Sequence, residues 1–327
     1  MHLVSLPTVS LFFASSFASP HSKRSVSGPV IDADFPDPAI IKTGGTWYAF
    51  ATGTGDRPGI KTQIASSPDF ETWTVLDQDA LGTLPSWVNE TSPNVWAPDV
   101  IRRKDGKFLM YFAATTTTAG EDRFHCVGTA VSDSVEGPYD SNSDTPLACP
   151  TDQGGAIDAS GFRDADGARY VLYKIDANAL GNGGSCGNTV PPILSTPIMI
   201  QRVKQDGFTP VGEAVELITN DEADGPLVEA PAMRKYGDTY FLFFSSNCYD
   251  SDLYDVSYAT SASPTGGFVK TDTPLFVTGD HGLIGPGGAD VRGKHMAFHG
   301  YRSEDDLGGP RAMYVATLTV DGDTVSA

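Results

Sequence analysis

The amino-acid sequence predicts an all-β protein built as a single five-bladed β-propeller. A motif recurs five times along the chain at a nearly constant spacing, and strand-like aromatic runs follow its copies. No stretch shows helical periodicity of any length. The 327 residues also include 35 glycines and 23 prolines, which favours many short strands joined by tight turns.

Each copy of the repeat begins with an acidic residue beside proline or small residues, followed by a strand, a polar turn and an aromatic strand. The five acidic residues, separated by 62, 59, 71 and 61 positions, are Asp37, Asp99, Asp158, Glu229 and Asp290. Units of about 60 residues with three or four strands suit propeller blades, which are small antiparallel sheets. Because an isolated blade cannot bury both of its faces, we expect the ring to close.

The position of the acidic residue within the repeat predicts where these side chains meet. In a propeller the first strand of each blade usually lines the central axis, and the acidic residue starts or directly precedes that strand. We therefore expect all five acidic side chains at one mouth of the axial channel. The alternative is that each acidic residue merely caps a turn. This does not explain why all five occur at the same place in the repeat.

Charge and the N-terminal segment restrict the partners and the location. The chain has 41 acidic against 22 basic residues, a net charge of −19, which disfavours nucleic acid and anionic membranes as partners because both require a basic surface. The apolar, small-residue segment ending at Ser16-Phe17-Ala18 predicts a signal peptide over residues 1–18, with a possible propeptide to residue 24. We expect a secreted, extracellular monomer whose catalytic propeller spans residues 28–327.

The four cysteines are Cys126, Cys149, Cys186 and Cys248. They show no Cys-x-x-Cys spacing, so a zinc knuckle is not indicated, and an even number in an exported chain favours two disulfides. Three pairings are possible. We prefer Cys126 with Cys149 and Cys186 with Cys248.

Four of the motifs resemble glycoside hydrolase family 43, and the resemblance covers roughly residues 28 to 318. The motifs are Phe35-Pro36-Asp37-Pro38, Asn94-Val95-Trp96-Ala97-Pro98-Asp99, Ala156-Ile157-Asp158 and Val228-Glu229-Ala230-Pro231. Members of that family are five-bladed propellers that act on arabinose- and xylose-containing polysaccharides. The resemblance implies an inverting hydrolase in which Asp37 is the general base and Glu229 the general acid. Asp158 would raise the pKa of the acid and orient it.

Inversion chemistry explains why three carboxyl groups are needed. One ionised and one protonated carboxyl group must stand about 6.5–9.5 Å apart, leaving room for a water molecule. Both carboxyl groups have an ordinary pKa near 4, so their surroundings must make the two pKa values different. A third carboxylate beside Glu229 disfavours its ionised form and keeps it a competent acid. The two prolines that flank Asp37 stiffen the backbone that aims the base.

Three further residues are candidates for substrate binding. Trp96 would form an aromatic wall for the sugar, although a tryptophan is as often part of a core. Phe35 lies beside the expected base in the sequence and would line the same pocket. Arg302 would reach sugar hydroxyls from blade five, the alternative being an ordinary surface arginine.

A metal or other cofactor is not predicted. Many relatives in the family carry a histidine at the start of blade five that coordinates an axial calcium ion or a water cluster. Gly288 stands at that position here, while His281 and His299 are nearby but out of register. The axial acidic residues could still attract a cation.

The expected function is exo-acting release of L-arabinofuranose from plant cell-wall arabinan or arabinoxylan. A β-xylosidase or an endo-1,5-α-L-arabinanase of the same family is the alternative. The inserted segments 180–197 and 246–255 are expected to wall off one side of the site, which favours exo action. A non-catalytic carbohydrate-binding propeller is a different class, and it would not need all three carboxylates. A retaining fructosidase-like propeller is disfavoured because Arg163-Asp164-Ala165 is a poor match to the Arg-Asp-Pro stretch of such enzymes.

Overall fold

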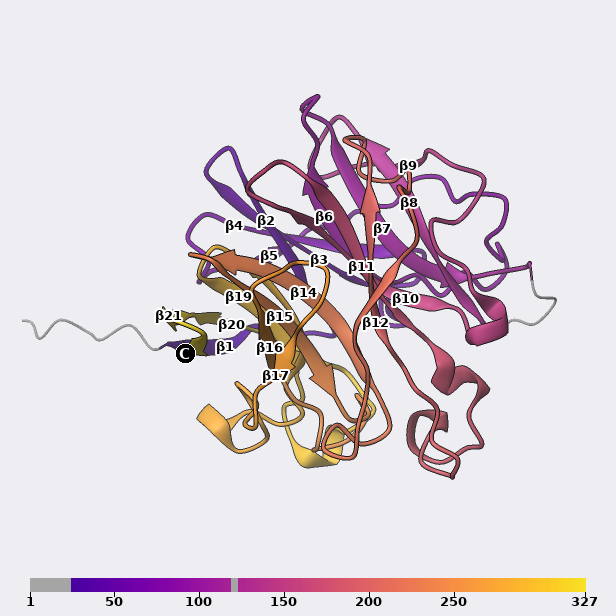
Figure 1. Cartoon of the computed structure of the whole chain (residues 1–327). Coiled ribbons are helices and arrows are strands. Elements are labelled where there is room, and N and C mark those ends of the chain that lie inside the picture. The colour runs from indigo at the N-terminus through magenta and orange to yellow at the C-terminus, as the bar shows by residue number, and fades with distance from the viewer. Residues whose placement is uncertain (1–24, 119–122) are drawn as a thin grey trace, which may run out of the picture.

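The computed structural model describes residues 25–118 and 123–327, and within them it confirms the predicted all-β propeller (Figure 1). Five four-stranded antiparallel sheets stand around a central axis in this part of the chain. The predicted signal peptide and propeptide lie outside the described residues. None of the described helices is both long and apolar enough to cross a membrane.

The first four blades follow the chain in order, each from its inner to its outer strand. Blade one contains β2 (Ala39–Thr43), β3 (Thr46–Thr52), β4 (Thr62–Ser67) and β5 (Thr74–Val75). Blade two contains β6 (Trp96–Arg102), β7 (Phe108–Thr115), β8 (His125–Ser132) and β9 (Asp140–Ser141). Blade three contains β10 (Ala156–Arg163), β11 (Arg169–Ile175), β12 (Ile198–Val203) and β13 (Val215–Ile218). Blade four contains β14 (Val228–Tyr236), β15 (Thr239–Ser246), β16 (Ser257–Ser261) and β17 (Val269–Lys270).

The fifth blade combines the two ends of the described chain. It contains β18 (Gly287–Arg292), β19 (His295–Gly300), β20 (Ala312–Thr317) and β1 (Val26–Ile31). A small hairpin follows, made of β21 (Thr319–Asp321) and β22 (Thr324–Ser326). Short 3-10 helices in the connections are η1 (Thr151–Gln153), η2 (Ala177–Leu180), η3 (Ser185–Gly187), η4 (Asp280–Gly282) and η5 (Glu304–Asp306).

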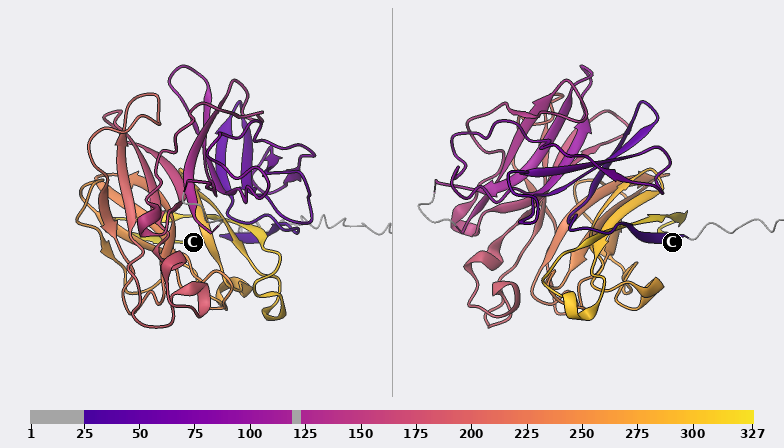
Figure 2. Two further views of the ribbon diagram at one scale, coloured as in Figure 1. Left: turned by 90° about the vertical axis from the view of Figure 1, so that its right-hand side faces the viewer. Right: turned by 180° about the vertical axis from the view of Figure 1, so that it is seen from behind.

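Strand β1 closes the ring. It pairs antiparallel with β20, with Val26 opposite Ala316 and Ile31 opposite Met313, and it lies beside the C-terminal strands in all views (Figures 1 and 2). The propeller therefore cannot open without breaking the pairs between its first and last strands. The sequence repeats did not indicate this strand, because it precedes the first acidic motif, and the domain begins before the expected residue 28.

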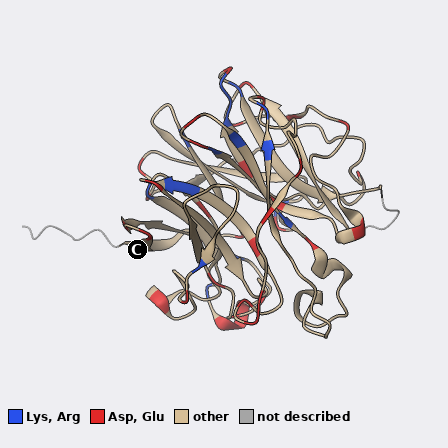
Figure 3. Cartoon of the chain, viewed as in Figure 1, with Lys and Arg blue, Asp and Glu red and all other residues tan. Residues whose placement is uncertain are grey.

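The core lies between the blades because strands are apolar on both faces. Along β15, Phe241 and Phe243 pack with blade five, whereas Leu242 and Phe244 pack with blade three. Successive strand residues point to opposite faces, so the unbroken aromatic run is what a blade buried on both sides requires. Acidic residues instead occupy many of the surrounding loops (Figure 3).

Each inner strand has a left-handed backbone residue at its start. The five residues, with φ between 42° and 59°, are Asp37, Ala97, Asp158, Ala230 and Gly288. In blades two to five the strand pairing is irregular at this point, as in a β-bulge. All five acidic residues line the cavity at this end of the axis, as expected, but they do not share one position relative to the left-handed residue.

The five acidic residues in fact occupy three positions around the bulge. Asp37 and Asp158 are the left-handed residues themselves, and Glu229 comes one residue earlier. Asp99 and Asp290 come two residues later, within β6 and β18. The spacing along the chain could not separate these positions, because a difference of one or two residues is small beside a repeat of about 60.

Removing β1 should destabilise the whole propeller. Deletion of residues 25–31 exposes the edge of β20 and removes the buried side chains of Val26 and Ile31, each worth about 1.5–3 kcal/mol. We expect the midpoint of thermal unfolding to fall by roughly 10 °C, measured by circular dichroism. Ser27→Ala, which keeps both buried side chains, should leave it nearly unchanged. Coincident transitions for the deletion and the full chain would contradict closure by β1.

Candidate active site

A cavity of about 390 Å³ opens where the inner strands begin, within the size range of small-molecule sites. All five blades contribute to its wall. The structure brings Asp37, Asp158 and Glu229 together in this cavity, as the repeat predicted. Trp96 also lines it. Glu229 is buried, whereas Asp37 and Asp158 are half-buried.

In three of the blades, a hydrogen bond to the preceding blade holds the left-handed residue. In each case the backbone N–H of the left-handed residue donates to a side chain on the second strand of the preceding blade, and these side chains occupy equivalent places along their strands. The pairs are Asp37 with His299 Nδ1 (3.0 Å), Ala97 with Thr52 Oγ1 (2.8 Å) and Gly288 with Ser245 Oγ (3.0 Å). Neighbouring blades are therefore locked together at the level of the cavity.

Blade three departs from this arrangement because Lys174 occupies the corresponding position on β11. An ammonium group only donates hydrogen bonds, so Asp158 Oδ2 itself accepts the N–H of Ala230 at 2.9 Å. Lys174 is fully buried. Its Nζ lies 2.9 Å from Glu229 Oε2 and 3.1 Å from Asp176 Oδ1. A buried cation thus stands directly beside the expected acid.

Asp37 is held in its ionised form. Arg311 Nη1 lies 3.0 Å from its Oδ1, and the Thr52 hydroxyl donates to its Oδ2 at 2.7 Å. Burial alone would raise the pKa of Asp37, but the Arg311 charge and the Thr52 hydrogen bond hold it below the ordinary value. Burial lowers the pKa of His299 to about 3, so this imidazole is neutral and its Nδ1 can accept the Asp37 N–H.

Asp158 and Glu229 form a coupled pair with different surroundings. Both Glu229 oxygens accept hydrogen bonds, Oε1 from the Tyr254 hydroxyl at 2.8 Å and Oε2 from Lys174. Burial and then the nearby charge of Glu229 raise the pKa of Asp158 to about 8, although Lys174 opposes this. Near neutral pH the cavity therefore contains an ionised Asp37 and, across from it, a carboxyl pair that retains a proton.

Comparison with known proteins agrees with this geometry. Residues 26–321 match the model of the family described as glycosyl hydrolases family 43. The chain belongs to this family. It is therefore a glycoside hydrolase, and inversion of the anomeric configuration is general in the family.

Individual relatives cover most of this family 43 chain. An extracellular endo-α-(1→5)-L-arabinanase of Bacillus subtilis is 26% identical over 83% of this chain and 81% of its own length. An extracellular exo-α-(1→5)-L-arabinofuranosidase of Cellvibrio japonicus is 27% identical over 84% of this chain and 80% of its own. The crystal structure of a thermostable family-43 glycoside hydrolase superposes with a TM-score of 0.75, at 25% identity, covering 90% of this chain and 92% of that one.

Only one of the three expected substrate-binding residues of the family 43 enzyme lies in the cavity. The Trp96 side chain is 37% exposed and stacks on His125, with ring centroids 3.7 Å apart and planes 20° apart. Its free face is available to a ligand. Phe35, in contrast, is fully buried in an apolar cluster that includes Ile31 and Trp47. The expectation that Phe35 lines the pocket is therefore corrected, because its ring completes the core beside blade one.

Arg302 is also not in the wall of the cavity. Its side chain is 42% exposed and pairs with Asp32 at 3.3 Å, so the expectation that it reaches the substrate is corrected. The arginine that reaches the site is Arg311, directly before β20. Nothing in the sequence marks Arg311, because its contact with Asp37 spans the junction between blades five and one.

Sequence reasoning also missed Lys174 and Tyr254. Lys174 did leave a signal, since it interrupts the run from Tyr170 to Ile175, which is otherwise aromatic and aliphatic. A lysine in such a strand is buried and needs a partner. Tyr254, in the connection between β15 and β16, gave no comparable signal.

The two remaining acidic residues of the repeat are paired with arginines. Arg292 contacts Asp99 at 2.7 Å and Asp290 at 3.0 Å, and Arg234 contacts Asp290 at 3.0 Å. These carboxylates are thus neutralised by side chains of the protein. At Gly288, an added Cβ would lie 2.6 Å from the His299 ring. The glycine at this position leaves room for His299 to reach Asp37.

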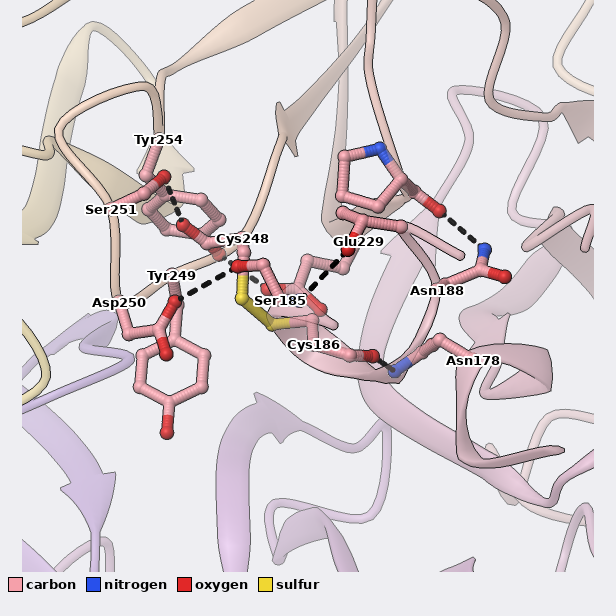
Figure 4. The surroundings of a disulfide bond; sticks show 12 residues. Asn178, Ser185, Cys186, Asn188, Glu229, Cys248, Tyr249, Asp250, Ser251 and Tyr254 are labelled. Atoms are coloured by element: carbon pink, nitrogen blue, oxygen red, sulfur yellow. Dashed lines mark hydrogen bonds between the residues drawn. A yellow bond between two sulfur atoms is a disulfide. The ribbon is translucent and has the colours of Figure 1, made fainter. Parts of the chain in front are cut away.

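Both preferred disulfides are present. Cys126 pairs with Cys149, and Cys186 pairs with Cys248. The second one lies at the rim of the cavity, which Cys186 helps to line (Figure 4).

Loss of the buried cation should be costly for the fold. Lys174→Met leaves Glu229 and Asp176 as buried carboxylates without a counter-charge, and we expect the free energy of unfolding to fall by about 3–5 kcal/mol at neutral pH. Urea denaturation measures this. Lys107→Met is the control, because its pair with Asp133 is 46% and 84% exposed and should contribute no more than about 1 kcal/mol. Equal stability of Lys174→Met and the unchanged protein would refute the argument.

Proposed function

We propose that the protein is a secreted, inverting exo-α-L-arabinofuranosidase that releases terminal L-arabinofuranose from plant arabinan or arabinoxylan. The observation that carries the proposal is the set of three carboxyl groups in one cavity that is walled on the side of blades three and four. The relatives named above support an arabinan substrate, since both are named for α-(1→5)-L-arabinan linkages. Both are also named extracellular, which agrees with the expected signal peptide.

Asp37 is the general base in this proposal. Its ionised state, maintained by Arg311 and Thr52, allows it to remove a proton from a water molecule as that water attacks the anomeric carbon. The two prolines beside it and the bond from its N–H to His299 fix its backbone. A base that is already oriented does not have to be ordered during the reaction.

Glu229 is the general acid in this proposal, acting with a proton supplied by Asp158. The pKa of Asp158 is raised to about 8, so Asp158 carries a proton near neutral pH that passes to Glu229 for the reaction. Tyr254 and Lys174 contact one oxygen each of Glu229 and so fix the plane of its carboxyl group. As the glycosidic bond breaks, Glu229 gives the proton to the leaving oxygen, while water attacks from the opposite face.

The shape of the cavity supports exo action. Trp96 offers an aromatic face on the side of blade two, and Arg311 stands beside Asp37. Cys186 and Tyr249, from the connections of blades three and four, also line the cavity, and the Arg311 guanidinium lies 4.9 Å from the centre of the Tyr249 ring. A sugar at a chain end can enter such a pocket, whereas an internal unit needs a groove that is open at both ends.

A substrate panel tests this assignment. We expect hydrolysis of p-nitrophenyl α-L-arabinofuranoside, and arabinose as the sole early product from arabino-oligosaccharides. Glu229→Gln is the control and should lose nearly all hydrolysis, with thermal unfolding within a few degrees of the unchanged protein. A preference for the β-D-xyloside would instead assign a β-xylosidase. Early arabino-oligosaccharides from debranched arabinan would assign an endo-arabinanase.

The pH profile tests the role of Asp37. The pKa of Asp37 is held low by Arg311, so the acid-side loss of kcat/KM reflects protonation of this base. Arg311→Met removes the charge and should move that limb to higher pH by about one to three pH units. Arg311→Lys retains a positive charge and should move it less. An acid limb that stays in place in Arg311→Met would show that Asp37 is not the group that titrates.

A further inference from the structure

A disulfide joins the connections of two blades at the rim of the cavity. Cys186 belongs to η3, in the segment between β11 and β12 of blade three, and Cys248 follows β15 of blade four. The two residues are 62 positions apart in the sequence. Cys186 lines the cavity, as does Tyr249 directly after Cys248. Figure 4 shows the disulfide with Glu229 and Tyr254 close by.

The blade-three segment is poorly suited to hold a wall by itself. Four of its eight residues from 181 to 188 are glycines, which have the greatest conformational freedom of all residues. Cys186 itself has φ of 46°, a left-handed conformation that is unfavourable for a residue with a side chain. Hydrogen bonds within the segment hold its own shape, so its attachment to blade four decides whether it stays against the cavity.

Most hydrogen bonds of this segment are internal to blade three, such as Gly183 N–H to the Gly187 carbonyl oxygen at 3.0 Å and Ser185 N–H to Thr189 Oγ1 at 2.9 Å, and few join Cys186 and its neighbours to blade four. Asn178 Nδ2 donates to the Cys186 carbonyl oxygen at 3.2 Å, and the Ser185 hydroxyl lies 3.5 Å from Asp250 Oδ1. The firmer contact is at the end of the segment, where Asn188 Nδ2 donates to the Pro226 carbonyl oxygen at 2.6 Å. The disulfide is therefore the main connection that fixes Cys186 against blade four.

The blade-four side of the disulfide is well anchored and leads to the reacting groups. Cys248 is buried, and the Tyr301 hydroxyl donates to the Tyr249 carbonyl oxygen at 2.8 Å. The Arg311 guanidinium lies 4.9 Å from the centre of the Tyr249 ring and also contacts Asp37. The disulfide thus connects a glycine-rich segment of blade three to a well-anchored one beside the proposed base.

We propose that the Cys186–Cys248 disulfide determines the action pattern of the enzyme by keeping one side of the cavity closed. With the bond intact, the wall stops a polysaccharide from lying across the site, so only terminal sugars react. With the bond broken, the 181–188 segment moves away and internal units gain access. This inference rests on the exo-arabinofuranosidase function proposed above.

The test compares products from linear arabino-oligosaccharides and debranched arabinan for three proteins. Cys186→Ala/Cys248→Ala should release oligosaccharides together with arabinose, and its ratio of viscosity loss to reducing ends on arabinan should rise several-fold. Cys126→Ala/Cys149→Ala removes the other disulfide, which does not line the cavity, and should keep the pattern of the unchanged protein. Circular dichroism establishes that each variant is folded.

A reversible measurement serves if the first double variant does not fold. In the Cys126→Ala/Cys149→Ala background, dithiothreitol can act only on Cys186–Cys248, so reduction should broaden the products and reoxidation should restore arabinose alone. The proposal is overturned if the folded variant, or the reduced protein, still releases arabinose alone. Oligosaccharides released by the unchanged protein would instead refute the exo function itself, which distinguishes the two failures.

Discussion

The structure depends on a single backbone constraint, the left-handed residue at the start of each inner strand. In blades two to five the strand pairing is bulged at this residue, and acidic side chains beside it line the axial cavity. The conformation is unfavourable for residues other than glycine, yet four of the five blades use one. Hydrogen bonds to the preceding blade hold this conformation at Asp37, Ala97 and Gly288. The ring that β1 closes is thus also what keeps the site in place.

The chemistry of the site arises where this pattern varies. Blade three places a lysine at the position from which Thr52, Ser245 and His299 accept hydrogen bonds in other blades. Lys174 instead contacts Glu229, and Asp158 takes over the bond to the next blade. The same change therefore supplies a buried cation to one carboxyl group and ties the other to blade four. Asp37, with Arg311 and a neutral His299 beside it, remains ionised on the opposite side.

Much of the fold and of the site could be predicted from the sequence, but the spacing of the motifs shows only which strands line the axis. The repeat predicted the blades and the meeting of Asp37, Asp158 and Glu229, because blade-length periodicity determines which strands line the axis. It also predicted that all five acidic residues meet at one mouth of the axis, and all five line the cavity, but it could not resolve the offsets of one or two residues around the bulge. Phe35 is close to Asp37 in the sequence and Arg302 lies in blade five, but neither property determines the direction of a side chain. Strand β1 and Arg311 make their contacts across the junction between the ends of the described chain, and no local sequence pattern indicates such contacts.

The central claim is that an ionised Asp37 and a proton-bearing pair of Asp158 and Glu229 act on opposite faces of one sugar. The most direct measurement is proton NMR of the anomer formed in the first minutes of hydrolysis of an α-L-arabinofuranoside, before mutarotation mixes the two forms. Attack by a water molecule on the face opposite the leaving group predicts that β-L-arabinofuranose is formed first. Initial formation of the α anomer would contradict the account, because it requires a covalent intermediate on one of these carboxylates.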